Sequence, residues 1–247
     1  MSNIYSKLIN KLTKRPLSIN ELEVLLSDLD NYCDASLELE LLQSSGLPLV
    51  FIKDQVFLKT TLTQATLDSY CIVDIETNGH NPQLHQPIEI GAILYKEGRV
   101  ERTFSSLIFC KEIPQAVTKL TGITPDMLVN APHLKSVLET FRVFLGDSIL
   151  VAHNADFDFN FLSQCLDYYD FGALYNFRIC TIKLARKLIK SERYSLGYLN
   201  EFLEINHFPL HRAYDDSVIA FEIFKKCLKL LPKSIYTSQD LIQFATQ

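Results

Sequence analysis

Two carboxylates stand one residue apart where an apolar stretch of the chain ends. The stretch reads YCIVDIETNG, Tyr70 to Gly79, and places Asp74 and Glu76 just before Asn-Gly. Alternate side chains of a β-strand share a face, so the two acids would project together. Like charges side by side repel, and their partial burial requires a cation, a hydrogen-bond network or a shared proton to offset the cost. The pair indicates either a cation-binding strand end or the solvated start of an acidic loop.

A further acid lies near the start of a helical segment. The segment HNADFDFNFLSQCLDYY follows the short strand SILVA, and its apolar residues recur at helical spacing, with Asp158 in the first turn. Acidic residues are common at this place because the positive end of the helix dipole favours them. Asp158 taken alone is therefore a weak indication of a functional site.

The segment PLHRAYDDSVIAFEIFKKCLKLL predicts another helix, with Asp216 on its first turns. His211 stands five residues earlier, which on a regular helix would be about 140° away around the axis. The two side chains can therefore converge only if His211 lies on the loop that enters the helix. Pro209, two residues before the histidine, favours such a loop.

The three segments DIETNG, HNADFD and HRAYDD match, in order and in structural setting, the three exonuclease motifs of the DEDD superfamily. The chain resembles the DEDDh branch, in which a histidine stands five residues before the last aspartate. The Tyr-x-x-x-Asp alternative does not apply, because the residue four positions after Tyr214 is Val218. The segment TGITPDML is similar to the Thr-Gly-Ile-Thr loop of the family. The resemblance covers about Ser69 to Leu231.

The resemblance implies an α/β fold of the ribonuclease H-like class, a mixed five-stranded sheet flanked by helices. It also implies a catalytic set made of Asp74, Glu76, Asp158, His211 and Asp216. The four carboxylates would hold two divalent metal ions, Mg²⁺ or Mn²⁺, because converging negative charges need cations and oxygen ligands favour hard ions. His211 would be the general base that takes a proton from water.

Within the family, the wording of the motifs is nearest to the proofreading exonucleases, such as the epsilon subunit of bacterial DNA polymerase III. This resemblance implies a 3′-5′ DNA exonuclease of replication proofreading or repair that releases nucleoside 5′-monophosphates from single-stranded or frayed 3′ ends of DNA. Thr77, His153 and Asn154 are candidates for seating the terminal nucleotide, with turn stabilisation an equal alternative for the last two. Only residues 232–247 follow the part of the chain that resembles the family. We therefore expect any contact with the polymerase subunit to be short, to be made by the N-terminal part instead, or to be absent.

Two other functions remain open. A 3′-5′ RNA exonuclease of the ribonuclease T or oligoribonuclease kind would share the metals and the mechanism, and would differ in its tolerance of the 2′-OH. A non-catalytic adaptor of the replication machinery would use the exonuclease fold only as a platform. The presence of all five catalytic positions argues against the adaptor.

Composition narrows the class of protein. A chain of 247 residues that is 47% hydrophobic can bury one large core, or a main domain and a small one. Its six cysteines form no C-x-x-C pair, and no run of about 18 apolar residues is present, so we expect a cytoplasmic protein with free thiols and no membrane span. The formal net charge of −5 argues against binding nucleic acid by overall charge.

The pattern of elements divides the chain into three parts. Residues 1–65 predict three short helices and a hairpin about Lys53-Asp54, an order that resembles a winged helix. The third helix carries acids, Asp34, Glu38 and Glu40, which favours a scaffold or protein-contact role over DNA reading. Residues 69–231 form the exonuclease-like part, with three antiparallel strands first and helices later. Residues 232–247 are predicted to be a short C-terminal tail.

Overall fold

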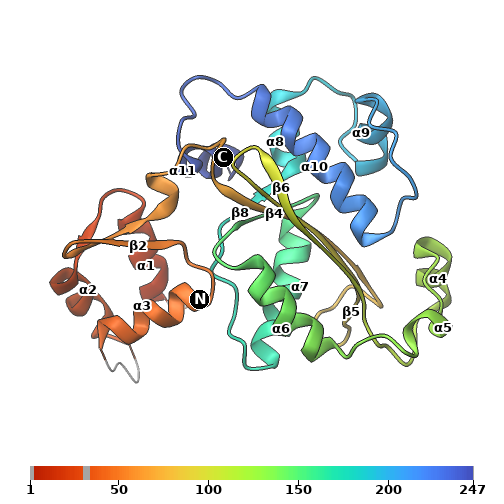
Figure 1. The fold of residues 1–247 in the computed structure, drawn as a ribbon, viewed down its shortest axis with the longest axis horizontal. Coiled ribbons are helices and arrows are strands. Elements are labelled where there is room, and N and C mark those ends of the chain that lie inside the picture. The colour runs from red at the N-terminus through yellow and green to blue at the C-terminus, as the bar shows by residue number, and fades with distance from the viewer. Residues whose placement is uncertain (1–2, 30–33, 247) are drawn as a thin grey trace.

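A computed structural model of the chain describes residues 3–29 and 34–246. The described residues contain a small sheet near the N-terminus, with strand order β1-β3-β2, and a larger sheet with strand order β6-β5-β4-β7-β8. Figure 1 shows the N-terminal elements as a separate lobe at one side of the larger sheet. Asp74, Glu76 and Thr77, three of the residues that the sequence predicts to be functional, lie on strand β4 of the larger sheet.

The larger sheet begins with the predicted antiparallel meander of three strands. Strand β4 pairs with β5, β5 pairs with β6, and the tight turn between the last two lies at Glu97 and Gly98, both with positive φ. Strands β7 and β8 add to the other side of β4 in parallel, so the sheet is mixed, as predicted. The strands are β4 (Ser69–Thr77), β5 (Pro87–Lys96), β6 (Arg99–Leu107), β7 (Ile149–Ala152) and β8 (Arg178–Cys180).

Helices cover both faces of this sheet and bury a separate apolar cluster on each face. One face packs against α6 (Leu134–Leu145) and α7 (Ala155–Tyr168). The other face packs against four helices, and two short helices lie beyond the sheet edge. These six are α8 (Thr181–Leu188), α9 (Leu196–Phe202), α10 (Ala213–Lys229) and α11 (Ser238–Thr246), then α4 (Gln115–Thr121) and α5 (Pro125–Leu128). The α/β class and the layered, ribonuclease H-like arrangement are therefore confirmed.

Alternation along β4 decides which face its acids occupy. Cys71 and Val73 belong to the cluster under α6 and α7, whereas Tyr70 and Ile72 belong to the cluster under α10. Even-numbered positions of the strand therefore face α10. Asp74 and Glu76 continue this face beyond the end of the apolar cluster.

The N-terminal lobe follows the predicted order of elements, with one addition. Its helices are α1 (Asn3–Leu12), α2 (Ile19–Leu26) and α3 (Ala35–Ser44), and the predicted capping box of Ser18 and Glu21 opens α2. The predicted hairpin consists of β2 (Leu49–Ile52) and β3 (Gln55–Leu58), and the two-residue strand β1 (Leu17–Ser18) pairs with it. The winged-helix likeness and the division at residues 65–69 stay predictions.

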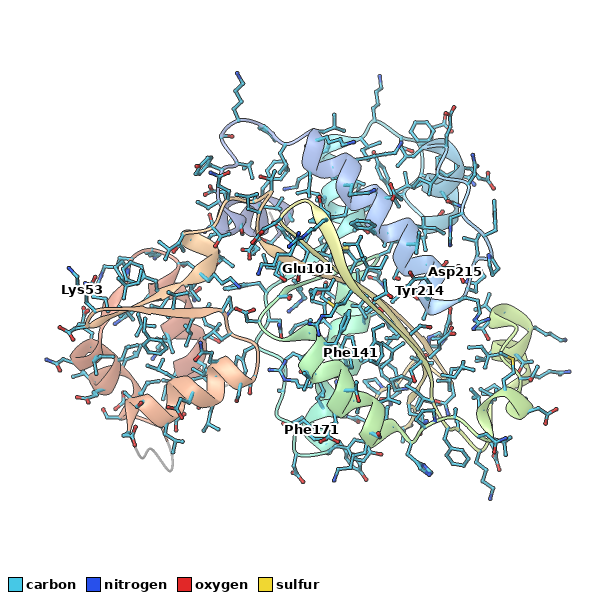
Figure 2. The ribbon with its side chains drawn as sticks, in the orientation of Figure 1. Lys53, Glu101, Phe141, Phe171, Tyr214 and Asp215 are labelled. Carbon is cyan, nitrogen blue, oxygen red and sulfur yellow. The ribbon has the colours of Figure 1, made fainter. Side chains whose placement is uncertain are left out.

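Two of the three acids named for the third helix have structural roles in the lobe. The Asp34 side chain caps the helix by accepting a hydrogen bond from the Leu37 N–H at 2.8 Å. Glu38 is buried and accepts a hydrogen bond from the Tyr5 hydroxyl at 2.6 Å. Figure 2 places Lys53, at the tip of the hairpin, at the opposite end of the molecule from Asp215 near the start of α10.

The segment predicted to be a C-terminal tail contains the packed helix α11. Leu241, Ile242 and Ala245 of this helix are buried in the cluster under α10. The backbone of the same region bonds to the stretch that follows the 3₁₀ turn η1 (Lys59–Thr61): the Ser238 N–H donates to the Thr63 carbonyl at 3.0 Å. The end of the described chain therefore joins the lobe to the larger sheet.

Within the described residues, no helix is both long and apolar enough to cross a membrane. The five cysteines that lie in this part of the chain are all free, and Cys33 lies outside the described residues.

Candidate active site

The acids of β4 meet the start of α10 because a glycine faces them. Asp74 is paired with Gly91 on β5, and a Cβ atom at Gly91 would lie only 2.2 Å from the backbone nitrogen of Tyr214. Real Cβ contacts do not come this close, so only glycine lets the first turn of α10 rest directly on β5. This close approach carries Asp216 to the end of β4.

Asp158 reaches the same place from the opposite face of the sheet. It lies in the first turn of α7 and is only 3% exposed. Its Oδ1 accepts a hydrogen bond from the Ile75 N–H at 3.2 Å. The Asp158 carboxylate is therefore held against β4 at Ile75, the residue that stands between Asp74 and Glu76 in the sequence.

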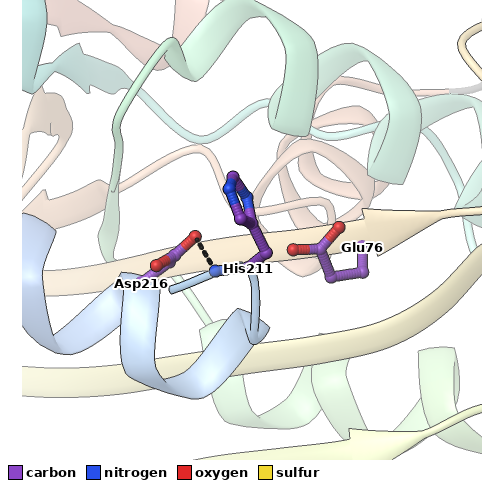
Figure 3. A group of neighbouring side chains, drawn as sticks. All are labelled: Glu76, His211 and Asp216. Atoms are coloured by element: carbon purple, nitrogen blue, oxygen red, sulfur yellow. Dashed lines mark hydrogen bonds between the residues drawn. The ribbon is translucent and has the colours of Figure 1, made fainter. Parts of the chain in front are cut away.

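His211 lies on the loop that enters α10, as convergence with Asp216 requires. Its φ of 61° is in the left-handed region, and its backbone N–H donates to Asp216 Oδ2 at 3.2 Å. Figure 3 shows the exposed imidazole between the carboxylates of Asp216 and Glu76. One potential ligand atom from each of Glu76, His211 and Asp216 lies within 4.8 Å of the others.

Burial and mutual repulsion make these carboxylates hard to ionise. Burial raises the pKa of Glu76 to about 8, that of Asp158 to about 7 and that of Asp216 to about 6. Burial, followed by the charges of Asp158 and Asp216, raises the pKa of Asp74 well above its usual range. Without a cation, the cluster therefore retains protons at pH values at which free carboxyl groups have lost them.

The donor set fits a divalent cation. Asp216 Oδ1 is buried and has no hydrogen-bond partner among the described residues, so one carboxylate oxygen remains unsatisfied. A buried acceptor without a partner is costly, and a cation bound at this oxygen would remove the cost. Carboxylate oxygens are the ligands that hard divalent ions prefer, and those that would hold such an ion come from Asp74, Glu76, Asp158 and Asp216.

The three predicted substrate residues have different surroundings. Thr77 is half-buried, and its hydroxyl donates to the Gly79 carbonyl at 2.8 Å. Asn154 is exposed and forms the N-cap of α7 with a left-handed φ of 82°. His153 uses both ring nitrogens within the protein, with Thr181 Oγ1 at 2.8 Å and the Tyr194 carbonyl at 3.0 Å. Burial lowers the pKa of His153 to about 4, and these contacts support its turn-stabilising alternative.

An apolar cavity of about 300 Å³ adjoins Glu76 and Thr77. Three larger cavities among the described residues, of about 340, 490 and 610 Å³, are lined by none of the four carboxylates. Part of the wall of the cavity beside Glu76 comes from α4 and the start of α7. The sequence pointed to this region through the TGIT segment, which begins at Thr121, but did not assign the wall side chains to the site. The side chains are Val117, Leu120, Thr121 and Phe157.

A fifth carboxylate near the site was also missed. Glu89 on β5 is paired with Glu76 on β4 and is only 2% exposed. Its Oε1 lies 2.7 Å from Arg212 Nη2 on the loop that enters α10. A glutamate inside the apolar run PIEIGAIL was the only signal of this residue in the sequence.

Comparison with known proteins identifies the family of this chain. The family model described as Exonuclease matches residues 71–224. The DNA polymerase III subunit epsilon of Aquifex aeolicus is 33% identical over 165 residues, which cover 66% of this chain and 82% of that protein. The PolC-type DNA polymerase III of Thermotoga maritima is 36% identical over 169 residues. These residues cover 67% of this chain but only 12% of the polymerase, so the chain spans a small part of that relative.

Solved structures agree on the fold. Exonuclease X in complex with 5′ overhanging duplex DNA has a TM-score of 0.53 at 24% identity, over 69% of this chain and 99% of that one. The E. coli exonuclease I complex with single-stranded DNA has a TM-score of 0.61 at 18% identity, over 68% of this chain and 42% of that one. The family model covers more than half of the chain, and the epsilon relative is matched over most of its length. The chain therefore belongs to the exonuclease family.

Proposed function

We propose that this chain is a metal-dependent 3′-5′ DNA exonuclease that removes nucleoside 5′-monophosphates from 3′ ends during replication proofreading or repair. The observation that carries the proposal is the convergence of Glu76, His211 and Asp216 within 4.8 Å at the end of β4. The names of the relatives, an epsilon subunit and PolC-type polymerases, support DNA as the substrate.

Two divalent ions, Mg²⁺ or Mn²⁺, are proposed to be held by the carboxylates of Asp74, Glu76, Asp158 and Asp216. When bound, such ions stabilise the charge that develops on the attacking and leaving oxygens of a phosphodiester. His211 would take the proton of the attacking water, because its ring stands exposed between Glu76 and Asp216 and its backbone is tied to the latter. The products would be a nucleoside 5′-monophosphate and a chain shortened at its 3′ end.

The cavity of about 300 Å³ beside Glu76 is proposed to seat the terminal nucleotide. Its apolar wall suits a nucleobase, since bases stack on flat apolar and aromatic side chains. Leu120 of α4, which is 58% exposed, and Phe157 of α7 both line this cavity. The Thr77 and Asn154 side chains would contact the sugar or phosphate. Single-stranded or frayed 3′ ends fit such a site, because a paired base cannot enter it.

The partner and the location are also proposals. A polymerase subunit of DNA polymerase III is the candidate partner, because the epsilon and PolC relatives carry that name. The N-terminal lobe is the candidate contact, since α11 is packed into the fold and the lobe exposes apolar side chains such as Leu41 and Phe51. Five free cysteines in the described residues fit a reducing compartment, and we place the protein in the cytoplasm.

The substrate can be tested with matched single strands of DNA and RNA. Each strand would be labelled at its 5′ end and incubated with the protein and Mg²⁺, and shortening would be followed over time. We expect DNA to be shortened from its 3′ end faster than RNA. A strong preference for RNA would replace the proposal with the RNA exonuclease. The partner would be tested separately, by co-elution of the protein with a replicative polymerase, with and without residues 1–65.

A further inference from the structure

The loop that enters α10 is tied to β5 by one buried carboxylate. Glu89 Oε1 accepts hydrogen bonds from Arg212 Nε at 3.2 Å and from Arg212 Nη2 at 2.7 Å. Glu89 Oε2 accepts from Arg212 Nε at 3.2 Å and from the Ala213 N–H at 2.9 Å. The two residues that Glu89 holds, Arg212 and Ala213, directly follow His211 in the chain.

This arrangement does not fit a metal ligand. Both oxygens of Glu89 already accept hydrogen bonds, so they have little capacity left for a cation. The charge of Glu89 in fact raises the pKa of Asp74, Glu76 and Asp216, and the guanidinium of Arg212 lies beside it as the compensating cation.

The held loop needs such an anchor. His211 has a left-handed φ of 61°, a conformation that costs free energy for a residue with a Cβ atom and persists only where the surroundings hold it. The imidazole is exposed, so side-chain packing does little to hold it. Asn200 and Asp215 hold the first part of the loop through bonds to residues 205–207, whereas His211 itself is held by its N–H bond to Asp216 and by the bonds of Glu89 to the next two residues.

We propose that Glu89 and Arg212 are a positioning pair that holds the backbone of His211, and with it the imidazole, in register with Glu76 and Asp216. Glu89 lies on β5, the strand next to the one that holds Asp74 and Glu76. Its bonds to Arg212 fix the position of the loop that contains His211. The catalytic consequence rests on the proposed exonuclease function, whereas the structural consequence, an ordered loop at 205–213, does not.

Kinetics and hydrogen exchange test the two consequences separately. In E89Q the amide replaces one acceptor oxygen by a donor that faces N–H groups, so at least one bond of the clamp is lost. We expect kcat for mononucleotide release to fall by about 10- to 100-fold, the range seen when the groups that orient active-site residues are changed, with KM within about threefold. Amide hydrogens at 205–213 should exchange faster, and the rise in melting temperature on adding Mn²⁺ should persist.

The pair should also show strong coupling. R212Q leaves Glu89 as an unpaired buried charge beside four other acids, which is worse than losing the pair. We therefore expect the double variant E89Q/R212Q to be no slower than R212Q. R212K keeps the positive charge but loses the two-pronged guanidinium, so its kcat should lie between that of R212Q and that of the unchanged protein. R212K also serves if E89Q does not fold. The control is E222Q on the same helix α10, which breaks the Glu222–Lys225 pair and should keep the unchanged kcat.

The outcomes separate this inference from the proposed function. If the unchanged protein releases no mononucleotide, the proposed function fails, and hydrogen exchange at 205–213 alone decides whether the pair holds the loop. If the unchanged protein is active, unaltered kcat in E89Q and R212K overturns the positioning role. Unaltered exchange at 205–213 in both variants overturns it whatever the kinetics show. Loss of the Mn²⁺ effect in E89Q would instead make Glu89 a ligand and overturn it as well.

Discussion

Asp74 on β4 lies opposite Gly91 on β5, and the missing side chain of Gly91 lets the first turn of α10 rest on the sheet. The acids of β4 and Asp216 of α10 can therefore meet, although Glu76 and Asp216 are 140 positions apart in the chain. The close backbone approach is as much a part of the site as the carboxylates, because it allows the first turn of α10 to lie directly against β5.

Replacing Gly91 with alanine should damage both the fold and the site. The new Cβ atom would meet backbone atoms of Ala213 and Tyr214 at 2.2 to 2.4 Å, which cannot move aside like the end of a side chain. We expect a loss of about 1–3 kcal/mol in the free energy of unfolding, measured with urea, and a fall in kcat. G197A is the control, because its Cβ would meet only the flexible end of Leu210 at 3.3 Å. Equal effects of G91A and G197A would contradict this explanation.

Removing the charge of Asp158 should abolish mononucleotide release. D158N keeps the shape of the side chain and its acceptor for the Ile75 N–H, but loses a cation ligand. We expect activity to fall by more than about 100-fold, beyond the range of groups that only orient ligands. D167N is the matched control, since Asp167 is exposed near the other end of the same helix α7. Comparable activities in the two variants would remove Asp158 from the ligand set.

The stability of the metal-free protein should fall as the pH rises. Folding raises the pKa of Glu76 to about 8 and that of Asp158 to about 7, so between about pH 4.5 and pH 8 the folded state binds more protons than the unfolded state. These groups therefore contribute most to the free energy of unfolding at pH values below the ordinary pKa of a carboxyl group. This contribution is lost as the pH rises through 7 to 8. The melting temperature in EDTA should be lower at pH 8.5 than at pH 5.5, and D158N should reduce the difference.

Divalent cations should reverse this trend. An ion that binds only the folded state stabilises it and replaces the bound protons, so added Mn²⁺ should raise the melting temperature most at the higher pH. If the melting temperature in EDTA is unchanged or higher at pH 8.5, the carboxylates do not carry raised pKa values, and the cation would not be needed to relieve them.

His211 should matter for the rate but not for binding the cations. Loss of a general base typically costs about 10²- to 10⁴-fold in rate, so H211A should release mononucleotides slowly. The rise in melting temperature on adding Mn²⁺ should remain, because the four carboxylates are intact. If H211A instead loses the Mn²⁺ effect, His211 serves as a ligand together with Glu76 and Asp216, which lie beside it.

The sequence predicted those parts of the site that depend on local patterns. Period-two alternation put Asp74 and Glu76 on one face, helical spacing put Asp158 in a first turn, and the angle on a helix put His211 on a loop. These features depend only on residues that are close together in the chain, so they follow from the local sequence without the tertiary structure.

Contacts between distant segments could not be predicted in this way. Glu89 meets Arg212 across 123 positions, and the apolar wall of the cavity comes from α4, which carries no charged or metal-binding signal. The two ring contacts of His153 likewise depend on Thr181 and Tyr194. The predicted tail is in part the helix α11, whose burial depends on the stretch after η1 and on α10.

The most direct test of the central claim is the release of mononucleotides from a 5′-labelled DNA single strand in the presence of Mn²⁺. The unchanged protein should produce a ladder that shortens from the 3′ end together with free nucleoside 5′-monophosphates, and EDTA or the D74A variant should stop both. If the purified protein produces no mononucleotide from any single strand, or if D74A retains the activity while folded, the acidic cluster at the end of β4 is not an exonuclease site.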